Sequence, residues 1–192
     1  MAATIALLVG SLRTGSYNQK LADVAEKIVR ARGHRVWRPN HDAYQMPIYH
    51  GDLEQSDFPP PGLALKSGIA VCDAILFVAP EYNGSVSPLL KNVIDWTSRS
   101  TDGEPPLALT AYRGKAAGLL SASIGPTGGV RALGHLRQIC QALQMIVVPQ
   151  EVRVGNAAAA FTPEGALADA GAATQLDLLL NSFLSLTERL AR

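Results

Sequence analysis

Three short segments of the sequence combine glycine with serine, asparagine or arginine, residue types that hold anions and let a backbone approach a ligand closely. They are GSLRTGS at residues 10–16, PEYNGS at residues 80–85 and SIGPTGG at residues 123–129. Each follows an apolar run that predicts a buried strand. Because the carboxyl ends of parallel strands open at one edge of a sheet, we expect the three segments to converge on one ligand site.

The first segment is the best suited to an anion. Gly10 and Gly15 have the spacing of the first two glycines of a triphosphate-binding loop, but Ser16 stands where that motif requires lysine. The missing lysine favours one phosphate of a larger ligand over a triphosphate. An ordinary turn with a serine cap and an exposed arginine is the alternative. The four candidate phosphate ligands, which offer hydroxyl, amide or guanidinium donors, are Ser11, Arg13, Ser16 and Asn18.

The second segment can present backbone to a flat ligand. Pro80 and Gly84 shape a turn in which Tyr82 supplies an aromatic face and Asn83 supplies an amide. The alternative is an ordinary strand-to-helix turn. In that case Glu81 is either a solvated carboxylate or a support behind the site.

The third segment has three glycines, which allow close approach of backbone to a ligand but equally suit a flexible turn. Neither it nor the first segment carries the GxGxxG fingerprint of dinucleotide-binding folds. The chain also lacks the GxSxG of serine hydrolases. Its histidines and cysteines show no metal-binding spacing. Cys72 and Cys140 lie in apolar segments, as expected of core residues in a reducing compartment.

The composition is that of one globular domain over residues 1–192. Of the 192 residues, 47% are apolar and 17% are charged, enough for one continuous core. A net charge of +1, without a basic stripe or polybasic tail, argues against binding to nucleic acid or to a membrane surface. The apolar run at residues 5–9 is too short for a signal peptide, so we expect a cytoplasmic protein.

Strands and helices alternate along the chain. Apolar runs predict strands at residues 4–9, 34–38, 74–79, 116–122 and 145–148. Three- and four-residue spacing and end signals predict helices at residues 18–32, 62–71, 88–98, 130–143 and from about 162 almost to the C-terminus, whereas residues 39–61 read as an irregular loop. This order predicts an α/β, flavodoxin-like three-layer sandwich. Its five-stranded parallel sheet would have the order 2-1-3-4-5.

Together the three segments resemble those of the NADPH-dependent FMN reductase family, flavodoxin-like proteins that include quinone, chromate and azo-dye reductases. The resemblance covers about residues 4–150. GSLRTGSYNQKLA resembles the family's phosphate loop, and PEYNGSVSPLLKNVIDW resembles its flavin-ring signature almost throughout. SIGPTGGVRALGHLRQIC matches the third loop and its helix more loosely. Thr14 and Gly15 stand where many relatives have Lys-Gly, which lowers the local positive charge.

The resemblance implies a bound FMN and assigns roles to residues of all three segments. The FMN phosphate would be held by Ser11, Arg13, Ser16 and Asn18. The isoalloxazine ring would be lined, largely through main-chain atoms, by Pro80, Glu81, Tyr82, Asn83 and Gly84. Ser85 is a further candidate in the same turn, and Ser123 would lie near the ring or the ribityl chain.

The implied activity is that of an FMN-dependent NAD(P)H oxidoreductase. NAD(P)H, the co-substrate, gives a hydride to FMN N5, and electrons then pass to a quinone, an azo compound, a metal oxyanion or free flavin. Because the flavin carries this chemistry, we expect no catalytic side chain and no metal. A flavodoxin-type electron carrier and a non-catalytic flavin-binding redox sensor are the alternatives. Relatives are typically homodimers or homotetramers, and the loops at 39–61 and 99–113 are candidates for shaping the entrance.

Overall fold

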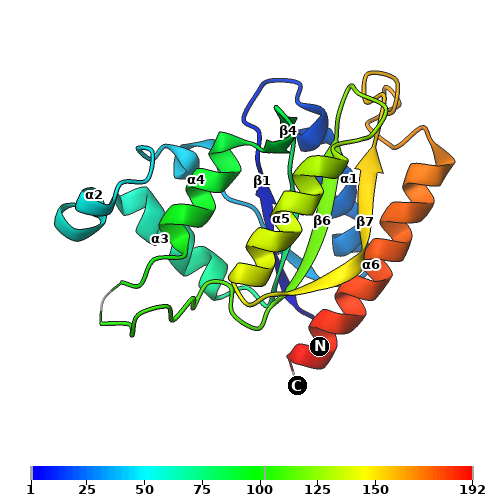
Figure 1. Ribbon diagram of the computed structural model, residues 1–192. Helices are drawn as coiled ribbons and strands as arrows, with labels where there is room; N and C mark the ends of the chain where they lie inside the picture. The colour runs from blue at the N-terminus through cyan, green and yellow to red at the C-terminus, as the bar shows by residue number, and fades with distance from the viewer. Residues whose placement is uncertain (1, 102, 192) are drawn as a thin grey trace.

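The centre of the molecule is a five-stranded parallel sheet, as seen in the computed structural model, which describes residues 2–101 and 103–191. The strand order β2-β1-β3-β6-β7 confirms the predicted order, counted over the strands of this sheet (Figure 1). In that order the strands are β2 (Arg35–Trp37), β1 (Thr4–Val9), β3 (Ala74–Val78), β6 (Ala116–Ala122) and β7 (Ile146–Val154). Every residue of β3 and β6 is buried, which explains why β3 is a continuous apolar run and β6 contains only one polar side chain, that of Ser121.

Helices cover both faces of the sheet and make the three layers visible in Figure 1. Alternate residues of β1 point to opposite faces, so Leu7 packs in one core and Leu8 in the other. The first core lies beneath α1 (Tyr17–Ala31) and α6 (Ala170–Leu190). The second lies beneath α3 (Pro60–Ala70), α4 (Pro88–Thr97) and α5 (Val130–Ala142). Both cysteines are buried in the second core, and burial raises the pKa of the Cys140 thiol to about 12.

The segment at residues 39–61 is more regular than the sequence suggests. It contains a 3₁₀ turn, η1 (His41–Tyr44), and a short helix, α2 (Gly51–Ser56). Local polar caps explain both elements, because Asn40 Oδ1 accepts from the N–H of Ala43 at 3.1 Å and His50 Nδ1 accepts from the N–H of Asp52 at 3.2 Å. The prediction of an irregular loop is therefore wrong for these residues.

The C-terminal part also departs from the prediction. Strand β7 continues to Val154, beyond the predicted end at residue 148, and its pairing with β6 shifts register around Pro149. Helix α6 begins at Ala170 rather than near residue 162, because Asp169 caps it by accepting from the N–H of Gly171 at 2.7 Å. Among the described residues, no helix is long and apolar enough to cross a membrane.

Candidate functional site

The three glycine-containing segments converge as predicted. A cavity of about 210 Å³, here called the edge cavity, lies where β1, β3 and β6 end. Eight of the predicted site residues line it: Ser11, Arg13, Ser16, Asn18, Pro80, Glu81, Tyr82 and Ser123. Asn83, Gly84 and Ser85 do not line this cavity. The parallel topology, rather than any one motif, brings these segments together.

One end of the edge cavity is rich in hydrogen-bond donors. Ser11 and Ser16 are 5% and 2% exposed, and neither hydroxyl is bonded to another residue that the structure describes. Ser16 occupies the N-cap position of α1, but its side chain makes no capping bond, so the hydroxyl is free to face a ligand. The first turn of α1 contains no acidic residue. Its outward N–H groups and the helix dipole therefore favour an anion at this end.

Arg13 adds positive charge beside these donors. Its side chain is exposed, donates to the Thr14 carbonyl at 3.3 Å and lies over the Tyr17 ring, 5.8 Å from the ring centroid. The described residues place no carboxylate in an ion pair with it. A guanidinium without a carboxylate partner remains available to a phosphate, to which it can donate two parallel hydrogen bonds.

Asn18 lines the cavity but uses its side chain for another purpose. Its Nδ2 donates to the carbonyl of Ala122 at 2.8 Å, and its Oδ1 accepts from the N–H of Ala122 at 3.0 Å. The residue is 4% exposed. The amide therefore fastens the start of α1 to the end of β6, and the main-chain N–H is the donor that Asn18 retains for a ligand.

Glu81 lines the edge cavity, and its carboxylate is bonded to the start of α5. Its Oε2 accepts from the N–H groups of Arg131 at 2.9 Å and Ala132 at 3.2 Å, in the first turn of α5. The N-cap of this helix is Gly129, which has no side chain to accept those bonds. Its backbone is left-handed, with φ of 84°, and an added Cβ would lie 2.0 Å from Ser121 Oγ. Close packing, rather than turn flexibility, thus requires this glycine.

The second segment forms a hairpin that the sequence interpretation missed. Strands β4 (Glu81–Tyr82) and β5 (Ser85–Val86) pair antiparallel, and Asn83 and Gly84 between them have φ of 51° and 76°. Two positive φ values define the type I′ turn, for which Asn-Gly is the favoured pair, so that dipeptide was the available signal. Ser85 is turned toward α5, where its Oγ lies 2.9 Å from Nδ1 of His135. Tyr82 remains 48% exposed at the edge cavity.

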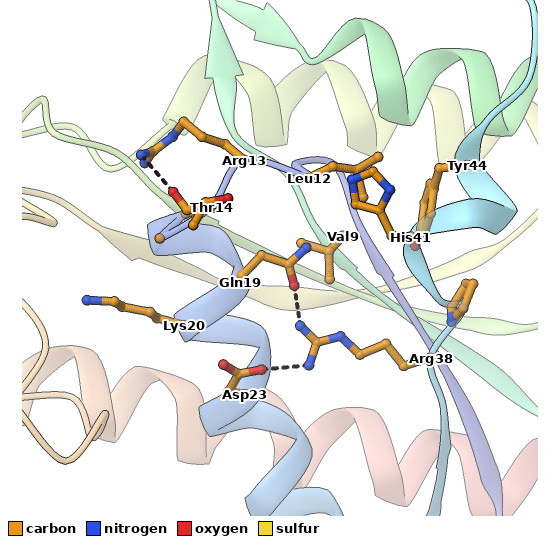
Figure 2. Close-up of a pocket in the computed structure, with 13 residues that line it drawn as sticks. Val9, Leu12, Arg13, Thr14, Gln19, Lys20, Asp23, Arg38, His41 and Tyr44 are labelled. Carbon is orange, nitrogen blue, oxygen red and sulfur yellow. Dashed lines mark hydrogen bonds and ion pairs between the residues drawn. The ribbon is translucent and has the colours of Figure 1, made fainter.

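A second cavity, of about 430 Å³, lies on the other side of the first segment (Figure 2). It reaches Pro39 and Tyr44, so part of the 39–61 loop lies here rather than at the edge cavity. Arg38 and Gln19, which the sequence interpretation did not single out, also line it. These two residues form no motif in the sequence, because they meet only when the fold brings the end of β2 beside α1.

Comparison with known proteins shows which family the chain resembles. The sequence pattern of the family described as NADPH-dependent FMN reductase matches residues 3–159. A 2-hydroxy-1,4-benzoquinone reductase from a Burkholderia species is 34% identical over 156 residues, which are 78% of this chain and 76% of that protein. An NAD(P)H-dependent FMN reductase from Pseudomonas aeruginosa is 38% identical over 161 residues, covering 83% and 82% of the two chains.

A solved structure shares the whole architecture. FerB, a flavoenzyme NAD(P)H:(acceptor) oxidoreductase from Paracoccus denitrificans, superposes with a TM-score of 0.81 at 29% sequence identity. The match covers 98% of each chain. It therefore extends through α6, which lies beyond the part of the chain where the sequence motifs are found.

Proposed function

The chain belongs to the NADPH-dependent FMN reductase family, and from this premise we propose that it is an FMN-dependent NAD(P)H oxidoreductase acting on a small-molecule electron acceptor. The observation that supports this most strongly is the edge cavity, which joins unpaired donors of the first segment to the hairpin of the second. When bound there, FMN would accept a hydride at N5 from NAD(P)H and supply electrons to a quinone, an azo compound, a metal oxyanion or free flavin.

The residues at the first segment fit a phosphate. Ser11 and Ser16 would donate hydroxyl hydrogen bonds, Asn18 would donate through its main-chain N–H, and Arg13 would add a charge-assisted bond. Two observations support the assignment. The Ser11 and Ser16 hydroxyls have no bond to a described residue, and the first turn of α1 contains no acidic residue. The chain holds these donors in place before a ligand arrives, because the loop is fixed at both ends by β1 and α1.

The residues at the hairpin fit the ring end of the same ligand. Pro80 is buried at the end of β3, and the half-exposed Tyr82 presents an aromatic face beside it. Ser123 lies across the cavity and is held by its N–H, which donates to the Val154 carbonyl at 2.9 Å. We assign Asn83, Gly84 and Ser85 to the rim, where the hairpin would limit access of acceptors to one face of the ring.

One experiment separates the proposed oxidoreductase from its two alternatives, a flavodoxin-type electron carrier and a non-catalytic redox sensor. The purified chain is loaded with FMN, and anaerobic absorbance is followed after addition of NADPH or NADH. We expect a yellow protein that bleaches with a pyridine nucleotide and recovers its colour with a quinone. Bound FMN that neither nucleotide reduces would indicate an electron carrier, and reduction without turnover would indicate a redox sensor. A chain that takes up no FMN would exclude all three.

A variant of Arg13 tests the orientation of the ligand. Arg13→Ala should weaken FMN binding by about 1.5–3 kcal/mol, the scale of a hydrogen bond to a charged group. Riboflavin, which has no phosphate, should bind the variant and the parent chain equally. Arg35→Ala serves as the control, since Arg35 is exposed on β2 and bonds to Thr4 instead of the cavity. Equal loss of FMN and riboflavin affinity would mean that the phosphate does not lie at Arg13.

A further inference from the structure

Two carbonyl oxygens at the start of the phosphate loop, defined as residues 10–16, accept hydrogen bonds from side chains outside the loop. Ser87 Oγ donates to the carbonyl of Gly10 at 2.7 Å, and Gln19 Nε2 donates to the carbonyl of Ser11 at 2.5 Å. An anion site needs its N–H groups turned inward and its carbonyls turned away, since a carbonyl oxygen repels a phosphate oxygen. Gln19 lines the second cavity and not the edge cavity, so its bond draws the Ser11 carbonyl toward the second cavity.

The bond from Gln19 works only if its amide has the correct orientation. A glutamine amide can be rotated so that its oxygen and nitrogen exchange places, and only the nitrogen donates. Arg38 removes this freedom, because its Nη2 donates to Gln19 Oε1 and a guanidinium offers no acceptor. The oxygen must face Arg38, which leaves the amino group for the Ser11 carbonyl. Figure 2 shows these two side chains pointing toward each other and joined by this bond, among the residues that line the second cavity.

Arg38 is in turn held by carboxylates of α1. Its Nη1 donates to Asp23 Oδ1 at 2.6 Å and to Glu26 Oε2 at 3.2 Å. Its side chain is 24% exposed. With two carboxylates and one amide as partners, Arg38 has its charge compensated and is poorly suited to bind a further anion. The contacts instead connect α1, the end of β2 and the phosphate loop.

We propose that Gln19 and Arg38 are positioning residues that set the phosphate loop for the phosphate of FMN, an inference that rests on the proposed function. Neither residue lines the edge cavity, so both act through the Ser11 peptide. Because a trans peptide is planar, fixing the Ser11 carbonyl toward Gln19 directs the N–H of Leu12 the opposite way. Arg38 orients Gln19, and Gln19 orients that peptide.

The first test compares FMN with riboflavin on Gln19→Met, which keeps the length of the side chain and removes its donor and acceptor. We expect the Kd of FMN to rise about 3- to 10-fold, the effect of one neutral hydrogen bond. The Kd of riboflavin should not change, because riboflavin has no phosphate. Equal changes for both ligands, or no change for FMN, would overturn the proposal.

The second test separates positioning by Arg38 from its long-range charge. Arg38→Met should weaken FMN binding in the parent chain but should add nothing in the Gln19→Met background. Arg35→Met removes one charge from β2, the strand that precedes Arg38, at a residue that bonds to Thr4 and not to the loop, so it should have little effect in either background. A penalty of Arg38→Met that persists without Gln19 would show direct electrostatics and overturn the proposed order.

The outcomes also separate this proposal from the proposed function. A parent chain that binds no FMN refutes the function itself. A parent chain that binds FMN, with unchanged FMN affinity in Gln19→Met and Arg38→Met, refutes only the positioning role. Arg38→Met is an independent variant if Gln19→Met does not fold, since it releases the Gln19 amide without substituting any residue of α1.

Discussion

Replacing Glu81 with alanine removes the only carboxylate that caps α5 in the described structure, and it does so from a position 50 residues away in sequence. Two N–H groups, of Arg131 and Ala132, lose acceptors at 2.9 Å and 3.2 Å. The Glu81 side chain is 13% exposed, so water replaces those bonds poorly. The change therefore acts on the end of the helix and on the hairpin that carries Glu81.

The expected loss follows from those contacts. Removing a capping side chain costs about 0.5–2 kcal/mol, and loss of a negative charge from a helix N-terminus adds about 0.3–1 kcal/mol. We therefore expect Glu81→Ala to lower the free energy of unfolding by about 1–3 kcal/mol. Glu81→Gln retains one acceptor oxygen and should lose less than half of that amount.

Urea unfolding of the ligand-free chain, followed by circular dichroism, measures both changes. Glu164→Gln is the matched control, because it removes one carboxylate from an exposed turn outside the site. The ratio of FMN to riboflavin affinity in Glu81→Ala should stay at the parent value, since the phosphate loop keeps its donors. An unchanged free energy of unfolding together with lost FMN binding would refute the reasoning, because Glu81 would then contact the ligand directly.

Three further predictions concern contacts that stabilise the fold. Gly129→Ala should destabilise the chain by about 1–3 kcal/mol, because the left-handed backbone is strained by a Cβ and that Cβ would contact β6. Gly134→Ala, within α5, should instead stabilise the chain by about 0.5–1 kcal/mol. Urea unfolding measures both changes. Asn18→Ala should cost about 2–4 kcal/mol in the same assay, because two buried main-chain groups of β6 lose their partners. Burial alone would raise the pKa of Glu104, but hydrogen bonds led by that from Lys66 outweigh it and lower the pKa from 4.5 to about 2. Its stabilising contribution is therefore complete above pH 4.5 and is lost as the pH falls toward about 2, and Glu104→Gln should flatten that part of the pH–stability curve.

The sheet and the site's location could be predicted because both depend on patterns that are local in sequence. Strands β1 and β6 match their predicted bounds, since each is a mainly apolar segment followed at once by a turn residue, Gly10 or Ser123. Once the strands are parallel and alternate with helices, the segments that follow them must meet at one edge. This geometry needs no knowledge of side-chain contacts.

The use of each polar side chain could not be predicted, because it depends on distant partners. Asn18 was a predicted phosphate ligand, but Ala122, 104 residues away, takes both ends of its amide. Arg38 and Gln19 carry no recognisable motif and meet only when β2 lies beside α1. The hairpin is a different case, since Asn83 and Gly84 gave a local signal that the interpretation did not use.

The three segments of the site are joined to one another in pairs by polar contacts. Ser87, just after the second segment, donates to Gly10 of the first at 2.7 Å. Asn18, just after the first, bonds to Ala122 at 2.8 Å, next to the third. Glu81 of the second accepts from the start of α5, which directly follows the third. Because these three links form a closed circuit, each segment is held by both of the others. The loss of one link should therefore loosen two walls of the edge cavity while the other two links remain as restraints, so that ligand affinity falls before the fold is lost.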